Sequence, residues 1–187
     1  MRFEPDPRFT FDTFVVGPGN RVAAAAARRA AESPGTSYNP LFVHGAPGSG
    51  KTHLLRAVGE LALAVRPGIR VLYDAAEDLV DRLSAAVVAG EVEAIRDELL
   101  EADLVLLDDA HRLAGRMRTQ DELLRTWDEL VRARTQVVLA ADRPPAEIGG
   151  LDERLRARIS GGLAVDISPA EPETRLAIVQ QDAAERG

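Results

Sequence analysis

The stretch Gly45-Ala46-Pro47-Gly48-Ser49-Gly50-Lys51-Thr52 decides the fold class of this chain. It matches the phosphate-binding loop pattern, which is Gly, any four residues, and then Gly-Lys-Thr. The apolar run Leu41-Phe42-Val43 before it predicts a buried parallel strand. Leucine and valine recur at helical spacing through residues 51–65 after it. The loop therefore lies between an expected strand and an expected helix, as the motif requires.

This arrangement predicts a site for a nucleoside triphosphate. Gly48 and Gly50 would let backbone N–H groups close around phosphate oxygens, and the helix N-terminus would add positive potential. Lys51, the sole lysine in the sequence, would reach the β- and γ-phosphates, and Thr52 would hold Mg²⁺. The alternative is a glycine-rich turn with a structural role, and the complete motif favours nucleotide binding. The expected nucleotide-binding residues of this stretch are Gly45, Pro47, Gly48, Ser49, Gly50, Lys51, Thr52 and His53.

The composition indicates one soluble α/β domain. The 187 residues are 45% hydrophobic and 28% charged, which is ordinary for a globular protein. There is no cysteine, which excludes a disulfide framework and a cysteine-based metal site. No apolar run approaches the ~18 residues of a membrane helix, and the N-terminus lacks the apolar core of a signal peptide. We therefore expect a cytoplasmic protein without membrane contact.

The net charge of −7 bears on the kind of partner. A dedicated nucleic-acid binder is usually basic on at least one face. Any contact with DNA would have to come from a local basic patch or from sequence outside these residues.

Strand-like and helical segments alternate along the chain. The expected strands are residues 41–43, 70–73, 104–107, 136–141 and 163–167. The expected helices are residues 21–32, 51–65, 77–88, 91–101, 120–134, 151–159 and 171–185. This alternation predicts a parallel, doubly wound sheet that binds ligands at the carboxyl ends of its strands. We expect residues 1–187 to form a single domain, in which residues 1–14 are an irregular N-terminal linker segment.

Acidic residues end two of the expected strands. Asp108 and Asp109 follow the apolar run 104–107, and Asp142 follows the strand 136–141. Beside a phosphate loop, Asp108 would orient Mg²⁺ and Asp109 would position or deprotonate the attacking water. Asp142, on the neighbouring strand, would sense the γ-phosphate or hold that water. The alternatives are a solvated acidic strand end for the pair and a turn-forming role for Asp142.

Three arginines lie on one short expected helix. Arg154 and Arg158 are four residues apart and share a face, whereas Arg156 points elsewhere. The alternatives are a solvated charged face and an arginine finger that reaches the γ-phosphate of a neighbouring subunit.

These motifs together resemble the AAA+ domain of the DnaA family of bacterial replication initiators. The resemblance covers nearly the whole chain. It rests on residues 9–17 with Asn20, and on residues 38–42, 106–109, 119–122, 142–145, 153–158 and 173–178. It implies an α/β AAA+ P-loop ATPase fold, with a five-stranded parallel sheet between two helical layers.

The resemblance also implies roles for individual residues. Val15, Val16 and Asn20 would lie at the adenine pocket of a site for ATP or ADP with Mg²⁺. Asp142 would be the first sensor. Arg158 would be the arginine finger, acting on ATP in the next protomer, so that ATP favours a head-to-tail homo-oligomer.

The sequence also departs from the family pattern. It ends at Gly187, before the family's helical lid with its second sensor and before its helix-turn-helix domain. Residues 76–101 occupy the place of the initiator-specific helix pair that grips single-stranded DNA, yet residues 91–98 are acidic where phosphate contact favours Lys or Arg. Arg116 and Arg118 form a small basic loop after the acidic pair, which is the candidate DNA contact.

Two functions stay open at this point. The first is an ATP-dependent initiator, or its ATPase core, with slow hydrolysis that depends on Arg158 of a neighbour. The second is a DnaA-like regulator or adaptor that binds nucleotide and docks onto an initiator or helicase partner, with little DNA contact of its own. A helicase-loader-like ATPase is a weaker form of the second, because Asp142-Arg143-Pro144-Pro145 and the paired acids fit the initiator better.

Overall fold

A computed structural model describes residues 2–186, without the side chains of residues 182 and 184–186. Its sheet is parallel throughout and has the strand order β2-β3-β4-β1-β5. The strands are β1 (Leu41–Gly45), β2 (Val71–Ala75), β3 (Leu104–Asp108), β4 (Gln136–Ala141) and β5 (Leu163–Ile167). The α-helices are α1 (Arg21–Glu32), α2 (Lys51–Val65), α3 (Ala76–Ala89), α4 (Val92–Glu101), α5 (Met117–Arg132), α6 (Glu153–Ser160) and α7 (Pro172–Arg186). Two 3₁₀ turns, η1 (Ala110–Leu113) and η2 (Pro145–Glu147), follow β3 and β4.

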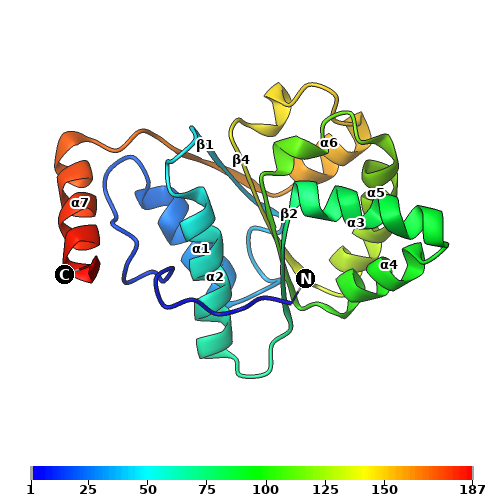
Figure 1. Cartoon of the computed structure of the whole chain (residues 1–187), viewed down its shortest axis with the longest axis horizontal. Helices are drawn as coiled ribbons and strands as arrows, with labels where there is room; N and C mark the ends of the chain where they lie inside the picture. The colour runs from blue at the N-terminus through cyan, green and yellow to red at the C-terminus, as the bar shows by residue number, and fades with distance from the viewer. Residues whose placement is uncertain (1, 187) are drawn as a thin grey trace.

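The helices form a layer on each face of the sheet (Figure 1). α1 and α2 cover one face, and α3, α5 and α6 cover the other, with α4 packed outside α3 and α5. The three-layer α/β fold expected from the sequence is confirmed. The expected neighbourhood of β3 and β4 is also confirmed, so Asp108 and Asp142 leave adjacent strands at the same edge.

α1 lies close to α2 because its buried face consists of alanine. Ala23, Ala27 and Ala30 are fully buried and occupy one side of the helix. Small side chains let two helix backbones approach each other and the sheet. This layer supports the phosphate loop, since α2 begins where the loop ends.

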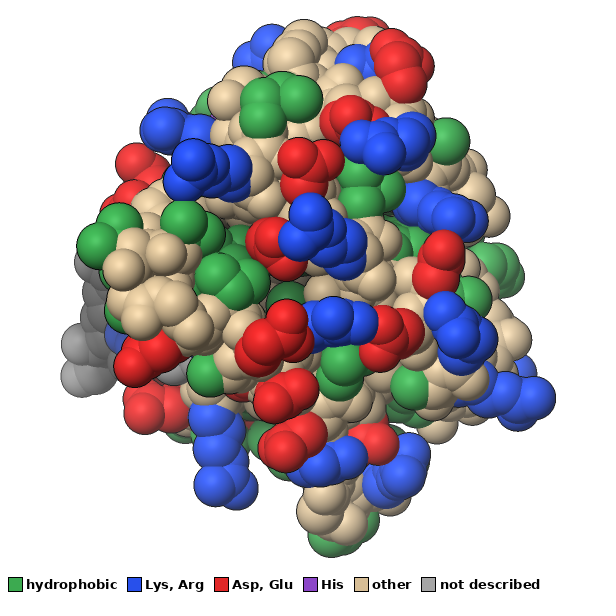
Figure 2. Space-filling model, turned by 90° about the vertical axis from the view of Figure 1, so that its right-hand side faces the viewer, with side chains coloured by type: hydrophobic (Ala, Val, Ile, Leu, Met, Phe, Trp, Pro, Cys, Tyr) green, Lys and Arg blue, Asp and Glu red, His purple; other side chains and the backbone are tan. Residues whose placement is uncertain are grey.

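The opposite layer uses larger apolar side chains and carries many ion pairs. Leu123, Trp127 and Leu130 recur at helical spacing and bury one face of α5. Outside this core, Arg82 pairs with Asp74 and Glu98. Figure 2, which views this side, shows acidic and basic side chains interspersed over the surface.

α7 lies apart from the two helical layers, beyond the N-terminal segment (Figure 1). Its Gln181 amide donates to the carbonyl oxygen of Thr13 at 2.8 Å, which joins the last helix to residues 9–20. In the described part of the chain, no helix has both the length and the apolar character needed to cross a membrane.

The bounds of α1, α2, β4 and β5 match the sequence expectations at both ends, and the other helices and strands differ from them by one to three residues at one end or both. α5 begins at Met117, three residues before the expected start, and the carbonyl oxygen of its N-cap Arg116 accepts from the Gln120 N–H at 3.0 Å. α6 begins at Glu153, two residues after its expected start, because the Asp152 side chain caps it by accepting a hydrogen bond from the Arg154 N–H at 2.8 Å.

Candidate nucleotide-binding site

The phosphate loop leaves β1 and enters α2 through two glycines in the left-handed region. Gly48 has φ 76° and Gly50 has φ 97°, conformations that side chains with a Cβ rarely adopt. Gly50 is the N-cap of α2, so the first N–H groups of that helix face the loop. Free N–H groups at a helix N-terminus attract anions such as phosphate.

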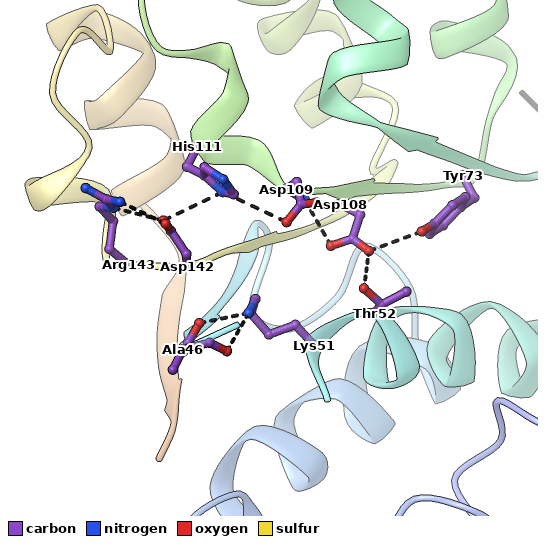
Figure 3. A network of polar contacts seen from close by, with 10 residues as sticks. Ala46, Lys51, Thr52, Tyr73, Asp108, Asp109, His111, Asp142 and Arg143 are labelled. Atoms are coloured by element: carbon purple, nitrogen blue, oxygen red, sulfur yellow. Dashed lines mark hydrogen bonds and ion pairs between the residues drawn. The ribbon is translucent and has the colours of Figure 1, made fainter. Parts of the chain in front are cut away.

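Lys51 lies at the centre of this loop. It is 7% exposed, and its Nζ donates to the carbonyl oxygens of Gly45 at 2.8 Å and Ala46 at 2.9 Å (Figure 3). These two hydrogen bonds satisfy two of the three donors of the buried ammonium group, which lies next to the loop N–H groups. The sequence expectation for Lys51 is therefore consistent with its position.

Thr52 and Asp108 are in direct contact across the sheet edge. The Thr52 hydroxyl donates to Oδ2 of Asp108 at 2.6 Å, and the backbone N–H of Asp109 donates to Oδ1 at 2.9 Å. Asp108 is 3% exposed. Hydroxyl and carboxylate oxygens are the hard ligands that Mg²⁺ prefers, so this donor pair fits the ion expected from the sequence.

Asp109, His111 and Asp142 gather beside that pair. Asp109 is exposed and has φ 50°, in the left-handed region. Nδ1 of His111 lies 4.0 Å from Oδ1 of Asp109 and 3.6 Å from Oδ1 of Asp142 (Figure 3). This nitrogen is buried and has no hydrogen-bond partner among the described residues. The histidine thus bridges the two acids that the sequence assigns to the attacking water.

Arg143 holds the carboxylate of Asp142 with two parallel hydrogen bonds. Nε lies 2.9 Å from Oδ1, and Nη2 lies 2.8 Å from Oδ2. These bonds lower the pKa of Asp142 below its ordinary value, with a smaller contribution from His111. Asp142 is therefore ionised at neutral pH.

A cavity of about 670 Å³ opens beside the phosphate loop. This volume is within the range of ~300–1,000 Å³ that small-molecule sites occupy. Four segments line it: residues 8–20, the phosphate loop with His53, residues 167–170, and α7. The lining residues are Arg8, Phe9, Thr13, Phe14, Val15, Asn20, Ala46, Pro47, Gly48, Ser49, Gly50, His53, Ile167, Ser168, Pro169, Ala170, Arg175, Ile178, Val179 and Gln181.

The three residues expected at the adenine pocket differ in position. Val15 and Asn20 line the cavity, whereas Val16 is 53% exposed and is not part of the lining. Asn20 fixes the turn, since its Oδ1 accepts from the Gly17 N–H at 2.8 Å and its Nδ2 donates to the Val15 carbonyl at 3.0 Å. Asn20 therefore shapes this wall of the cavity through its side-chain hydrogen bonds.

His53 joins the N-terminal segment to α2. Its Nε2 lies 2.9 Å from the carbonyl oxygen of Thr10 and 3.2 Å from the hydroxyl of Thr13. Its ring meets the rings of Phe9 and Phe14 edge to face, at centroid distances of 5.4 and 5.2 Å. His53 thus lines the cavity and also holds residues 8–20, which form part of its wall, against α2.

The arginines of α6 lie away from this cavity. Arg154 and Arg158 are exposed, and Arg158 pairs with Asp128 of α5 at 2.9 Å. Arg156 is partly buried and donates to the carbonyl oxygens of Ile148 and Leu151. None of the three lines the cavity described above.

Comparison with known proteins identifies the family. The family described as "Bacterial DnaA ATPAse domain" matches residues 5–166. The chain belongs to the bacterial DnaA ATPase domain family. Chromosomal replication initiator protein DnaA of Thermus thermophilus is 43% identical over 182 residues, which are 97% of this chain and 42% of that protein. The chain thus spans about two-fifths of the length of this DnaA relative.

Solved DnaA structures have the same fold. Domain III of the Thermotoga maritima replication initiation protein DnaA superposes with a TM-score of 0.95 at 36% identity, covering 99% of this chain and 78% of that one. A replication initiator DnaA bound to AMPPCP and single-stranded DNA superposes with a TM-score of 0.89 at 37% identity, covering 96% and 56%. The resemblance to DnaA stated from the sequence motifs is confirmed.

No role in the site was predicted for Tyr73, and residues 173–178 entered the prediction only as part of the resemblance to the DnaA family. Tyr73, within the apolar strand β2, contacts Asp108, and His111 bridges two acids. Arg175 and Ile178 of α7 reach the cavity although they lie more than 100 residues after the phosphate loop. The acidic strand end could have suggested His111 through its spacing, but the contribution of α7 depends on tertiary packing.

Proposed function

We propose that this chain is the ATP-binding domain of a DnaA-like replication initiator. It binds ATP or ADP with Mg²⁺, assembles head to tail with other copies when ATP is bound, and hydrolyses ATP slowly. The observation that carries the proposal is the contact between Thr52 and Asp108 at 2.6 Å, beside the buried ammonium of Lys51, within a DnaA-family domain. A DnaA relative whose structure contains AMPPCP supports the choice of nucleotide.

The triphosphate would lie along the loop N–H groups with its base in the 670 Å³ cavity. Lys51 would exchange its bonds to Gly45 and Ala46 for the β- and γ-phosphates. Mg²⁺ held by Thr52 and Asp108 would supply neutralisation of phosphate charge. Because ammonium and N–H groups are already gathered there, binding needs little rearrangement.

Hydrolysis needs a water molecule in line with the γ-phosphate. Asp109 would orient or deprotonate that water, and Asp142 would act as the sensor that holds it from the neighbouring strand. His111 lies between the two carboxylates and would limit their separation. Arg158 of the next molecule would stabilise the transition-state charge, which makes turnover slow for an isolated copy.

Assembly is tested by substituting the proposed arginine finger. Arg158→Ala should bind Mg·ATP as the parent does, because Arg158 is proposed to act on the nucleotide of another molecule and pairs with Asp128 within its own. The parent should form a larger species when ATP is added, and light scattering should show that Arg158→Ala does not. The ATP turnover of the variant should also fall by about 10³-fold or more. Arg125→Ala is the matched control, since Arg125 is an exposed arginine of α5 that pairs with Glu122. Equal assembly and hydrolysis in Arg158→Ala and the parent would refute the role between subunits.

A second candidate function is a DnaA-like regulator or adaptor that docks onto an initiator or helicase partner. The acidic surface of the helix pair at residues 76–101 favours this second function. Within these residues, all of which the structure describes, the exposed charged side chains are acidic: Glu77, Asp78, Asp81, Glu91, Glu93, Asp97 and Glu101. The two arginines of the pair, Arg82 and Arg96, are partly buried and engaged by acids. If this pair is the initiator-specific element, it repels phosphate.

Binding to single-stranded DNA separates the two candidates. An initiator should bind a labelled dT oligonucleotide in the presence of Mg·ATP, through the exposed Arg116 and Arg118 before and within α5. The Arg116→Ala/Arg118→Ala protein should then lose affinity by about tenfold and show a smaller salt dependence, while Arg125→Ala should not change. Fluorescence anisotropy measures this. No binding by the parent at low salt would favour the regulator.

A further inference from the structure

Asp108 receives a third hydrogen bond, from a residue outside the nucleotide-binding motifs. The hydroxyl of Tyr73 donates to Oδ2 of Asp108 at 3.1 Å, the same oxygen that accepts from Thr52 (Figure 3). β2 and β3 are parallel neighbours, and Tyr73 lies opposite Leu106. Because side chains alternate along a strand, Leu106 and Asp108 share a face, and a tyrosine is long enough to reach from one position to the next.

The ring of Tyr73 is held from two sides. The Arg56 guanidinium of α2 lies 4.8 Å from the ring centroid, and the ring of Phe3 meets it edge to face at 6.3 Å. Arg56 also lies 5.3 Å from the centroid of Phe9, which lines the cavity. These contacts hold the ring in place, and Arg56 also interacts with the hydroxyl, which can accept from the guanidinium while it donates to Asp108.

The hydroxyl of Tyr73 is one of three donors that hold the Asp108 carboxylate, and it donates to the oxygen that also accepts from Thr52. The three donors, from Thr52, Asp109 and Tyr73, leave the Asp108 carboxylate one orientation.

We propose that Tyr73 is a positioning residue for the metal-binding carboxylate of Asp108. This inference rests on the proposed function, since it assigns Tyr73 a role in the same site. Thr52 can donate its proton to Asp108 and still offer lone pairs to a cation. Tyr73 therefore sets how the carboxylate faces the cation, and it contacts neither nucleotide nor metal itself.

The test is Tyr73→Phe, which keeps the ring contacts with Arg56 and Phe3 and removes the hydroxyl. The matched control is Tyr38→Phe, because Tyr38 is the other of the two tyrosines and is exposed. Binding of a fluorescent ATP analogue is measured in EDTA and then as a function of Mg²⁺ concentration. In EDTA, Tyr73→Phe should bind within twofold of the parent. The Mg²⁺ concentration for half-maximal binding should rise about three- to tenfold, in line with the loss of a hydrogen bond to a charged group.

The outcomes separate this inference from the proposed function. A parent protein that binds no nucleotide overturns both. A parent that binds in a Mg²⁺-dependent way, with Tyr73→Phe showing the same Mg²⁺ dependence, overturns the role of Tyr73 and leaves the proposed function standing. If Tyr73→Phe lost the same affinity for the ATP analogue with and without Mg²⁺, Tyr73 would have a general structural role, and its role as a positioning residue would be overturned. In the Asp108→Asn background, Tyr73→Phe should have no further effect on the Mg²⁺ dependence.

Discussion

The carboxylate of Asp142 lies between an arginine and a histidine. Arg143 binds it from the solvent side with two hydrogen bonds, and His111 faces it at 3.6 Å. The pKa of Asp142 is lowered by Arg143 first and by His111 to a smaller degree. Arg143 thus keeps the proposed sensor charged, and it also competes with any other group for the same oxygens.

Replacing Arg143 tests this account. In Arg143→Ala, the pKa of Asp142 should rise toward its ordinary value, which is about 3.9 in model peptides. Because the folded-state pKa is depressed, this pair stabilises the fold above the unfolded-state pKa and ceases to do so as the pH falls through the folded-state value. Carboxyl carbon NMR follows the titration of Asp142 in both proteins. An unchanged pKa in Arg143→Ala would contradict the assignment.

At the scale of helices and turns, a single buried amide joins three segments. Gln120 of α5 is fully buried, and its Nε2 donates to the carbonyl oxygens of Leu113 at 2.8 Å and Gly150 at 3.0 Å. Its Oε1 accepts from the backbone N–H of Asp152 at 2.5 Å. η1, which follows the acidic strand end, is thereby tied to the start of α6, which carries Arg158.

Gln120→Leu should therefore destabilise the domain. Leu113 and Gly150 keep other donors to their carbonyl oxygens, from Arg116 and Gly115, but the Asp152 N–H loses its partner. An unsatisfied buried donor costs about 1–3 kcal/mol. Urea unfolding followed by far-UV circular dichroism measures the loss. Gln180→Leu, at an exposed position of α7, is the control and should change the free energy of unfolding by less than about 0.5 kcal/mol. Equal free energies of unfolding for both variants would contradict the stabilising role of the Gln120 hydrogen bonds.

Elements with strong local patterns could be predicted from the sequence. The bounds of α1 and α2 agree with the expectation to the residue, because an alanine run ended by Pro34-Gly35 and a helix begun by the phosphate loop leave little choice. The expected start of α6 at Leu151 was two residues too early, because the side chain of Asp152 caps the helix that begins at Glu153. Local signals fix such elements, whereas tertiary contacts decide their ends.

The same limit applies to the site. The phosphate loop and the acid pair could be predicted, because each needs particular residue types at fixed spacing. Tyr73 could not, since a tyrosine in a strand is most simply a core residue, and its contact with Asp108 depends on the strand order β2-β3. Val16 at the adenine pocket stays a prediction from the resemblance, and its side chain is exposed beside the turn that Asn20 fixes.

Over the whole molecule, two apolar layers meet at one sheet, and the phosphate loop lies at the sheet edge between them. The cavity beside the loop is closed on the far side by residues 8–20 and by α7. Segments from both ends of the chain therefore form one wall, and the phosphate loop forms the other. A nucleotide bound there would contact both, so binding should stabilise the fold as a unit.

The most direct test of this account is the heat of Mg·ATP binding to the parent and to Lys51→Ala. Arg66→Ala is the control, because Arg66 is an exposed cation that follows the opposite end of the same helix. We predict saturable binding at one site by the parent and by Arg66→Ala, and an affinity at least about tenfold lower for Lys51→Ala, since its ammonium is the charge nearest the loop. Indistinguishable binding isotherms for Lys51→Ala and the parent would contradict the assignment of this site to a nucleoside triphosphate.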